Sequence, residues 1–172
     1  MKFTFENILI IIFSALAVAT AIIMITRRNP VKSVLFLVAN FFCVSAIYLL
    51  LKAQFIAIIQ VVVYAGAIMV LFLFVIMLLN LTDESKLTES ITYKKMAAVL
   101  LAIMLFSIFA ITTYFGFLGK FPAINQTAEQ LGTVEAIGND LYTTYSFPFE
   151  LVSFILLAAI VGAIVLAKKK FE

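Results

Sequence analysis

Apolar residues are concentrated in five long runs that short polar segments separate. A helix needs about 20 mostly apolar residues to cross the hydrocarbon core of a bilayer, and each run is close to that length. None of the runs alternates apolar and polar residues, as the strands of an outer-membrane barrel do. Because lipid offers no partners to backbone N–H and C=O groups, each run is predicted to be a helix. The runs cover about residues 5–25, 34–51, 53–79, 96–117 and 149–167.

The composition agrees with this pattern. Hydrophobic residues make up 65% of the 172 residues and charged residues 12%, whereas a soluble domain carries roughly 25% charged residues. The net charge of +3 comes from lysines and arginines beside the apolar runs, so it indicates membrane anchoring and not binding to nucleic acid. We therefore predict an all-α integral membrane protein, with five transmembrane helices in one membrane domain, residues 1–172.

Lysine and arginine are unevenly divided between the connecting segments, which predicts the orientation. Cytoplasmic loops carry the excess of these residues. Nine lie on one predicted side, namely Arg27, Arg28, Lys32, Lys86, Lys94, Lys95, Lys168, Lys169 and Lys170, and three on the other, namely Lys2, Lys52 and Lys120. The N-terminus is therefore expected outside and the C-terminus in the cytoplasm.

The start of the chain also fits a secretory signal peptide, because Lys2 precedes an apolar run that contains Ala17-Val18-Ala19. The run continues to Ile25 and its stronger positive flank follows it, so a membrane span is favoured. The connection around Lys52 is short and predicts an antiparallel hairpin of the second and third runs. Residues 118–147 are predicted as a long outside loop with weak helix signals, a length typical of functional or partner-covering loops.

Few residues that carry chemistry are present. The chain has no histidine, and Cys43 is its single cysteine, which excludes an intrachain disulfide, a zinc site and an iron–sulfur cluster of about four ligands. Proton paths through membranes use buried Asp, Glu, Lys or His, and the interiors of the five runs contain none. We predict no catalytic, cofactor-binding or metal-binding residue, and neither a self-contained enzyme nor a self-contained proton pump.

The polar residues inside the runs predict contacts between helices. Gln60 and Tyr64 are four apart, so they are expected to share one face of a helix, and Tyr48 lies in the preceding run. Such residues commonly form interhelical hydrogen bonds. Ala158 and Gly162 show the small-residue spacing that lets two helix backbones approach closely.

The third run is longer than a bilayer requires. Its 27 residues would extend for about 40 Å as an α-helix, against a hydrocarbon core of about 30 Å. Tilt absorbs such an excess, and so does a local distortion such as a π-bulge. Gly66 lies near the middle of the run and tolerates unusual backbone angles. A hinge at Gly66 and close helix packing at residues 64–67 are both open readings.

Three stretches resemble a known family. They are Asn29-Pro30-Val31, the run from Gln60 through VVVYAGAIMVLF to Asn80, and Leu141-Tyr142-Thr143 with the segments Pro148–Leu151, Leu156–Ala158 and Gly162-Ala163. In their order and five-span layout they are similar to chain J of the bacterial NADH–quinone oxidoreductase, respiratory complex I. Its mitochondrial counterpart is NADH dehydrogenase subunit six. The resemblance covers nearly the whole chain, and the VYAGAIMVLFLF run is its most specific part.

The resemblance implies a subunit of the membrane arm, in a bacterial inner membrane. Its partners would be the other membrane-arm subunits, especially the small ones near the quinone site and the first antiporter-like subunit. The chain itself would carry no cofactor, since FMN, iron–sulfur clusters, quinone and NADH belong to other subunits. In this family the third span is described as passing between a π-bulged and an α-helical form, which opens or closes a water path. Carried over, this helix switch falls on Tyr64, Ala65 and Gly66.

One departure from the family changes the expected role. Some relatives carry glutamate where this chain has Gln60, so gating is expected here and not direct proton carriage by the third span. Gln60, Tyr48 and Glu150 are expected to make supporting polar contacts. Glu150 lies at the outer border of the fifth run, where a helix dipole stabilises a carboxylate at the N-terminus.

The predicted function is therefore coupling of quinone reduction to proton transfer through a switchable third helix. The nearest alternative is a small membrane subunit of a multisubunit cation/proton antiporter or of a membrane-bound hydrogenase. An independent transporter would need a charge in mid-membrane, which the runs lack. A purely structural scaffold predicts that the third span tolerates substitution as well as the first.

Overall fold

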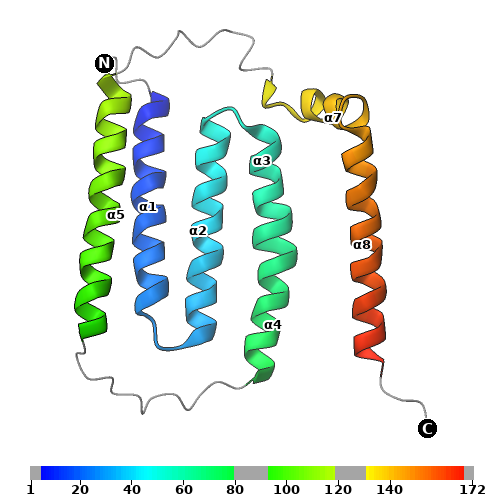
Figure 1. Ribbon diagram of the computed structural model, residues 1–172, viewed down its shortest axis with the longest axis horizontal. Helices are drawn as coiled ribbons and strands as arrows, with labels where there is room; N and C mark the ends of the chain where they lie inside the picture. Colours follow the sequence, from blue (N-terminus) through cyan, green and yellow to red (C-terminus); the bar gives the residue numbers. More distant parts are fainter. Residues whose placement is uncertain (1–4, 80–92, 119–130, 169–172) are drawn as a thin grey trace.

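The computed structural model describes residues 5–79, 93–118 and 131–168, and this part of the chain is helical without strands. Its elements are α1 (Phe5–Thr26), α2 (Pro30–Leu50), α3 (Gln54–Ile59), the π-helix η1 (Gln60–Ile68), α4 (Met69–Leu79), α5 (Tyr93–Leu118), α7 (Val134–Tyr142) and α8 (Ser146–Ala167). Figure 1 shows them with these labels. Helices α3, η1 and α4 continue one another and form the third span.

Five helices are long and apolar enough to cross a membrane, as the pattern of apolar runs predicted. Three predicted boundaries were wrong by about one turn, and one of them is the start of α5, which lies at Tyr93 and not near residue 96. Helix α2 begins at Pro30, because Asn29 caps it by accepting the Lys32 N–H and proline suits the first helical position. Lys32 therefore lies in the first turn of α2 and not in the loop. Helix α8 begins at Ser146 and not near residue 149.

The spans stand in a row, and only part of the row is packed (Figure 1). Helix α2 packs against α1 on one side and against α3, η1 and α4 on the other. Helix α5 contacts none of the described elements, and α8 contacts only α7. Apolar side chains are consequently exposed over residues 96–115 of α5 and along α8. Such continuous apolar surfaces are expected to be covered by lipid or by helices of other chains.

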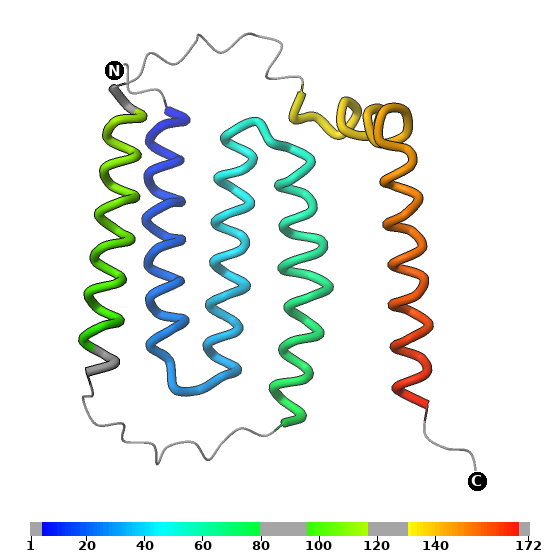
Figure 2. The backbone as a smooth tube through the Cα atoms, in the orientation of Figure 1, coloured from blue at the N-terminus to red at the C-terminus, as the bar shows by residue number. Residues whose placement is uncertain are grey.

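Different segments lie at the two ends of the helices that form this row (Figure 2). The first turn of α1, the α2–α3 turn and α7 lie at one end, and the α1–α2 connection and the last turns of α4 and α8 lie at the other. We call the first the outer end and the second the inner end, after the predicted orientation. The hairpin predicted around Lys52 is present as a tight turn between α2 and α3.

The predicted outside loop contains a helix that the sequence pattern did not identify. Helix α7 covers Val134–Tyr142, with Thr133 at its N-cap accepting the Ala136 N–H. Residues 119–130 of that loop lie outside the described part. Helix α7 joins α8 at a corner where the Tyr142 and Phe149 rings meet edge to face, with centroids 5.1 Å apart. The connection is therefore a structured arm and not an irregular loop.

Candidate functional site

The third span changes its helical form in its middle. Its first turns are α-helical, the nine residues Gln60–Ile68 form a π-helix, and the inner part is α-helical again. In a π-helix each N–H donates to the carbonyl five residues earlier. Met69 closes the segment in this way, since its N–H donates to the Tyr64 carbonyl. Tyr64, Ala65 and Gly66, the residues proposed as a switch, all lie inside this π-helix.

The two buried residues of this segment follow the π spacing. Gln60 and Ala65 are five apart and are buried, with 8% and 6% of their surface exposed, whereas Tyr64 is 46% exposed. A π-helix aligns residues five apart, whereas an α-helix aligns residues four apart. The shared face of Gln60 and Tyr64 stays a prediction, because the Tyr64 ring also contacts α2, at Phe41.

Helix α2 holds the segment just before η1. The Ser45 hydroxyl donates to the Ala57 carbonyl at 2.8 Å, and both residues are buried. The Phe41 ring meets the Tyr64 ring edge to face, with centroids 5.9 Å apart. These contacts join α2 to α3 and to the first half of η1. No residue of α4 is buried. Contacts within this chain therefore hold the inner half of the third span less firmly than its outer half.

Gly66 stands close to the backbone within this π-helix. A Cβ atom at this position would lie 3.3 Å from the Val61 carbonyl oxygen, five residues earlier. That separation is tighter than nine in ten Cβ contacts in proteins, so a side chain here would press on the acceptor of the π-type bond. A residue larger than glycine therefore requires the backbone to shift by a few tenths of an ångström at this position.

Most of the chain matches a known protein family. Residues 20–166 match the model of the family described as NADH-ubiquinone/plastoquinone oxidoreductase chain 6. The chain belongs to this chain 6 family.

Similar proteins span nearly the same length as this family member. NADH-ubiquinone oxidoreductase chain 6 of Cyanidium caldarium is 40% identical over 167 residues, covering 92% of this chain and 82% of the relative. NADH-quinone oxidoreductase subunit J of Rickettsia prowazekii is 31% identical, covering 92% and 78%. NAD(P)H-quinone oxidoreductase chain 6 of Leptolyngbya boryana is 34% identical, covering 93% and 78%. The resemblance found in the motifs is thus confirmed at the level of the family.

The remaining predicted contacts of this chain 6 protein are not gathered at η1. Tyr48 contributes its backbone carbonyl, which accepts the Ala53 N–H at 2.9 Å in the α2–α3 turn. Glu150 lies on α8, which does not contact the third span. Because α8 begins at Ser146, Glu150 is in the second turn of that helix and not at its N-terminus. The helix dipole acts within the first turn, so the expected dipole role of Glu150 was wrong.

The chain 6 fold also contains a cavity that the sequence did not predict. It has a volume of about 410 Å³ and opens between α1, α2 and α4 near their inner ends. Its lining residues are Met24, Arg27, Arg28, Pro30, Ser33, Val34, Leu37, Phe72 and Ile76. Two of these, Phe72 and Ile76, belong to α4, so any rotation of the inner half of the third span reshapes this cavity.

Proposed function

We propose that this chain is a membrane-arm subunit of a proton-translocating NADH–quinone oxidoreductase, and that its third span gates proton transfer by switching between π-helical and α-helical forms. The observation that carries the proposal is the π-helix Gln60–Ile68, in a chain of this family, with Gly66 against the Val61 carbonyl. π-Helical segments are rare and are frequently found at functional sites.

The switch acts as a change of helical register. Replacing bonds to the fifth preceding residue by bonds to the fourth shifts the register by one residue, which corresponds to about 100° of rotation and about 1.5 Å of rise. The outer half is held by the Ser45 bond to Ala57 and by buried Gln60, whereas α4 has no buried residue. The inner half therefore turns, and Phe72 and Ile76 on it change the cavity that they line.

The chain contributes gating and no acid–base chemistry. In the described spans Asp, Glu, Lys and Arg occur only within the first two turns, at Glu6, Lys32, Lys94, Lys95 and Glu150, and the middle of each span has none. A proton path through a membrane needs such groups at that depth. The carboxylates of the path belong to neighbouring subunits, and the third span determines whether water reaches them. FMN, iron–sulfur clusters, NADH and quinone are bound by other subunits. The chain is non-catalytic and forms one membrane domain in the bacterial inner membrane, with its N-terminus outside.

Its neighbours in the assembly are helices of other membrane-arm subunits. The support is the open row of spans, in which α5 contacts no described element and α8 contacts only α7. Membrane helices pack through close van der Waals contact and interhelical hydrogen bonds, and these two make no such contact with α1–α4. We place the small subunits near the quinone site and the first antiporter-like subunit against these surfaces.

The test is Gly66→Val in the assembled complex, purified in mild detergent and reconstituted in vesicles. Valine adds a branched side chain against the Val61 carbonyl and is expected to hold the span in one form. Co-purification of flavin and iron–sulfur subunits identifies the complex, and NADH oxidation with an artificial electron acceptor shows that assembly is intact. The expected result is a severe loss of proton transfer coupled to quinone reduction.

Gly116→Val is the matched control, because a Cβ at Gly116 meets nothing within 4 Å in this chain. The proposal is wrong if the fully assembled Gly66→Val complex pumps as well as the Gly116→Val complex. Isolation with antiporter subunits, and without flavin or iron–sulfur subunits, would instead support the antiporter alternative.

A further inference from the structure

We propose that Gly132 is a positioning residue, whose backbone joins the α7–α8 arm to the α2–α3 turn and thereby ties α8 to the outer end of the third span. This inference rests on the proposed function, because the joint acts through the switch in that span. No motif in the sequence pointed to Gly132, and its contact is visible only in three dimensions.

The contact at Gly132 leaves no room for a side chain. A Cβ atom there would clash with the Lys52 carbonyl oxygen and would lie 3.1 Å from the Lys52 carbonyl carbon and 3.2 Å from the Ala53 Cα. All three are backbone atoms, so no rotamer change relieves the clash. No glycine in the described part has a positive φ. Glycine is therefore needed at this position for close approach and not for an unusual backbone angle.

The same residue caps the third span. The Phe55 N–H donates to the Gly132 carbonyl at 3.2 Å. Phe55 is the second residue of α3, and the first four N–H groups of a helix have no partner within the helix. Ala53, at the N-cap, supplies no side-chain acceptor. The carbonyl of Gly132 therefore satisfies an amide that the third span leaves free at its outer end.

The turn that receives Gly132 is itself well defined. Lys52 adopts φ of 63°, the left-handed conformation that L-residues seldom adopt. Its ammonium group pairs with Glu6 of α1 at 3.3 Å, on the surface. A surface pair of this kind contributes little to stability, and it joins the turn to α1, whereas the backbone contacts of Gly132 join the turn to the α7–α8 arm.

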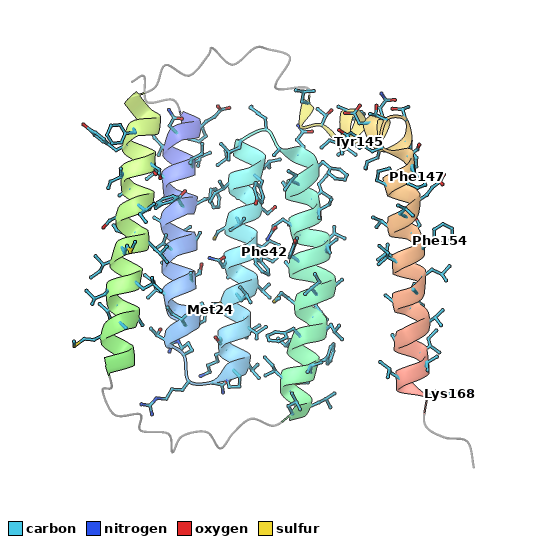
Figure 3. All side chains as sticks on the ribbon, in the orientation of Figure 1. Met24, Phe42, Tyr145, Phe147, Phe154 and Lys168 are labelled. Carbon is cyan, nitrogen blue, oxygen red and sulfur yellow. The ribbon has the colours of Figure 1, made fainter. Side chains whose placement is uncertain are left out.

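Helix α7 connects Gly132 to α8. Thr133 caps α7, and the α7–α8 corner is closed by the Tyr142–Phe149 ring pair and by the Tyr145 N–H bond to the Asp140 carbonyl at 2.9 Å. Figure 3 shows Tyr145 at this corner, with Phe147 and Phe154 along α8. Within the described part α8 contacts only α7, and α7 contacts only α8 and α3. Displacement of α8 by a neighbouring subunit therefore reaches the third span through α7, by its packing on α3 and by the Gly132 joint that precedes it.

The position of the joint connects it to the switch. Phe55 precedes the π-helix, which starts at Gln60, by little more than one helical turn. A register change needs one fixed end, and the Gly132 joint fixes the outer one. Loosening it lets both halves of the third span move, so that less of the rotation reaches the inner cavity.

The experiment compares Gly132→Ala with Gly138→Ala in the intact, reconstituted complex. Gly138 lies on α7 six residues further on, and a Cβ there meets nothing within 4 Å. Alanine at Gly132 must move the arm from the turn by about 1 Å to restore an ordinary contact. We expect hydrogen exchange of the Phe55 amide to become about tenfold faster. Protons transferred per NADH should fall by roughly twofold or more. Gly138→Ala should change neither quantity.

Each outcome separates the joint from the switch. Unchanged exchange at Phe55 in Gly132→Ala would show that the joint does not exist. Faster exchange with unchanged pumping, in a complex that Gly66→Val does impair, would show that the joint is only structural. Normal pumping by Gly66→Val would instead refute the proposed function. If Gly132→Ala does not assemble, Thr133→Ala loosens the α7 side of the joint without a clash, and the same two readouts must move together in it.

Discussion

The hydrogen bond from Ser45 to the Ala57 carbonyl gives a prediction that separates packing of the third span from its helical propensity. Ser45→Ala removes a buried hydroxyl donor. Its acceptor, the Ala57 carbonyl at 2.8 Å, lies three residues before the π-helix. The Ala57 carbonyl keeps its bond from the Gln60 N–H, so no buried acceptor is orphaned. The cost is then that of one interhelical bond in a membrane protein, about 1 kcal/mol.

A loss of about 1 kcal/mol corresponds to about a fivefold increase in local opening of α3 from α2. We expect amides of residues 57–61 to exchange hydrogen about fivefold faster in the assembled complex, with α1 amides unchanged. Ser107→Ala is the matched control, because Ser107 makes a bond of the same length, 2.8 Å, but within its own exposed helix α5. The reasoning fails if Ser45→Ala exchanges like wild type, or if Ser107→Ala accelerates exchange in the third span as much.

Two further substitutions test other local arguments. Lys52→Gly should slow hydrogen exchange at the Phe55 amide, because glycine removes the left-handed strain of about 1–2 kcal/mol at this position. The substitution loses only a weak surface ion pair with Glu6. Faster exchange would contradict this. Asn40→Ala should loosen α1 from α2 by about 1 kcal/mol, since the Asn40 amide donates to the Ala17 carbonyl at 2.6 Å and to the Thr20 hydroxyl at 3.2 Å. Hydrogen exchange of residues 17–24 measures it, and unchanged protection there would show that the bond does not hold the two helices.

Much of the architecture was readable from the order of residues. The five spans follow from apolar runs, because a helix in lipid must satisfy its backbone within itself and must cover a fixed thickness. The excess length of the third run and Gly66 left a hinge open, and the resemblance to the family implied a switch at residues 64–66, which lie inside the π-helix. The family also followed from motifs, and the match over residues 20–166 confirms it.

Some features could not be predicted from regular α-helical geometry. Burial of Ala65 together with Gln60 was not predicted, because residues five apart align in a π-helix and not in an α-helix. The fifth run was predicted to begin near residue 149, whereas α8 begins at Ser146, since proline, here Pro148, is tolerated in the first turn of a helix.

The sequence alone determined that this protein has five helices long and apolar enough to cross a membrane, that its third span is unusual and which family it belongs to. These properties depend on hydrophobicity and residue type along the chain, which are local. Only the tertiary structure decided which carbonyl caps the third span, which residues of it face α2 and which spans remain unpacked. Those properties depend on distances between backbone segments far apart in sequence, such as Gly132 and Lys52, and no local pattern encodes such a distance.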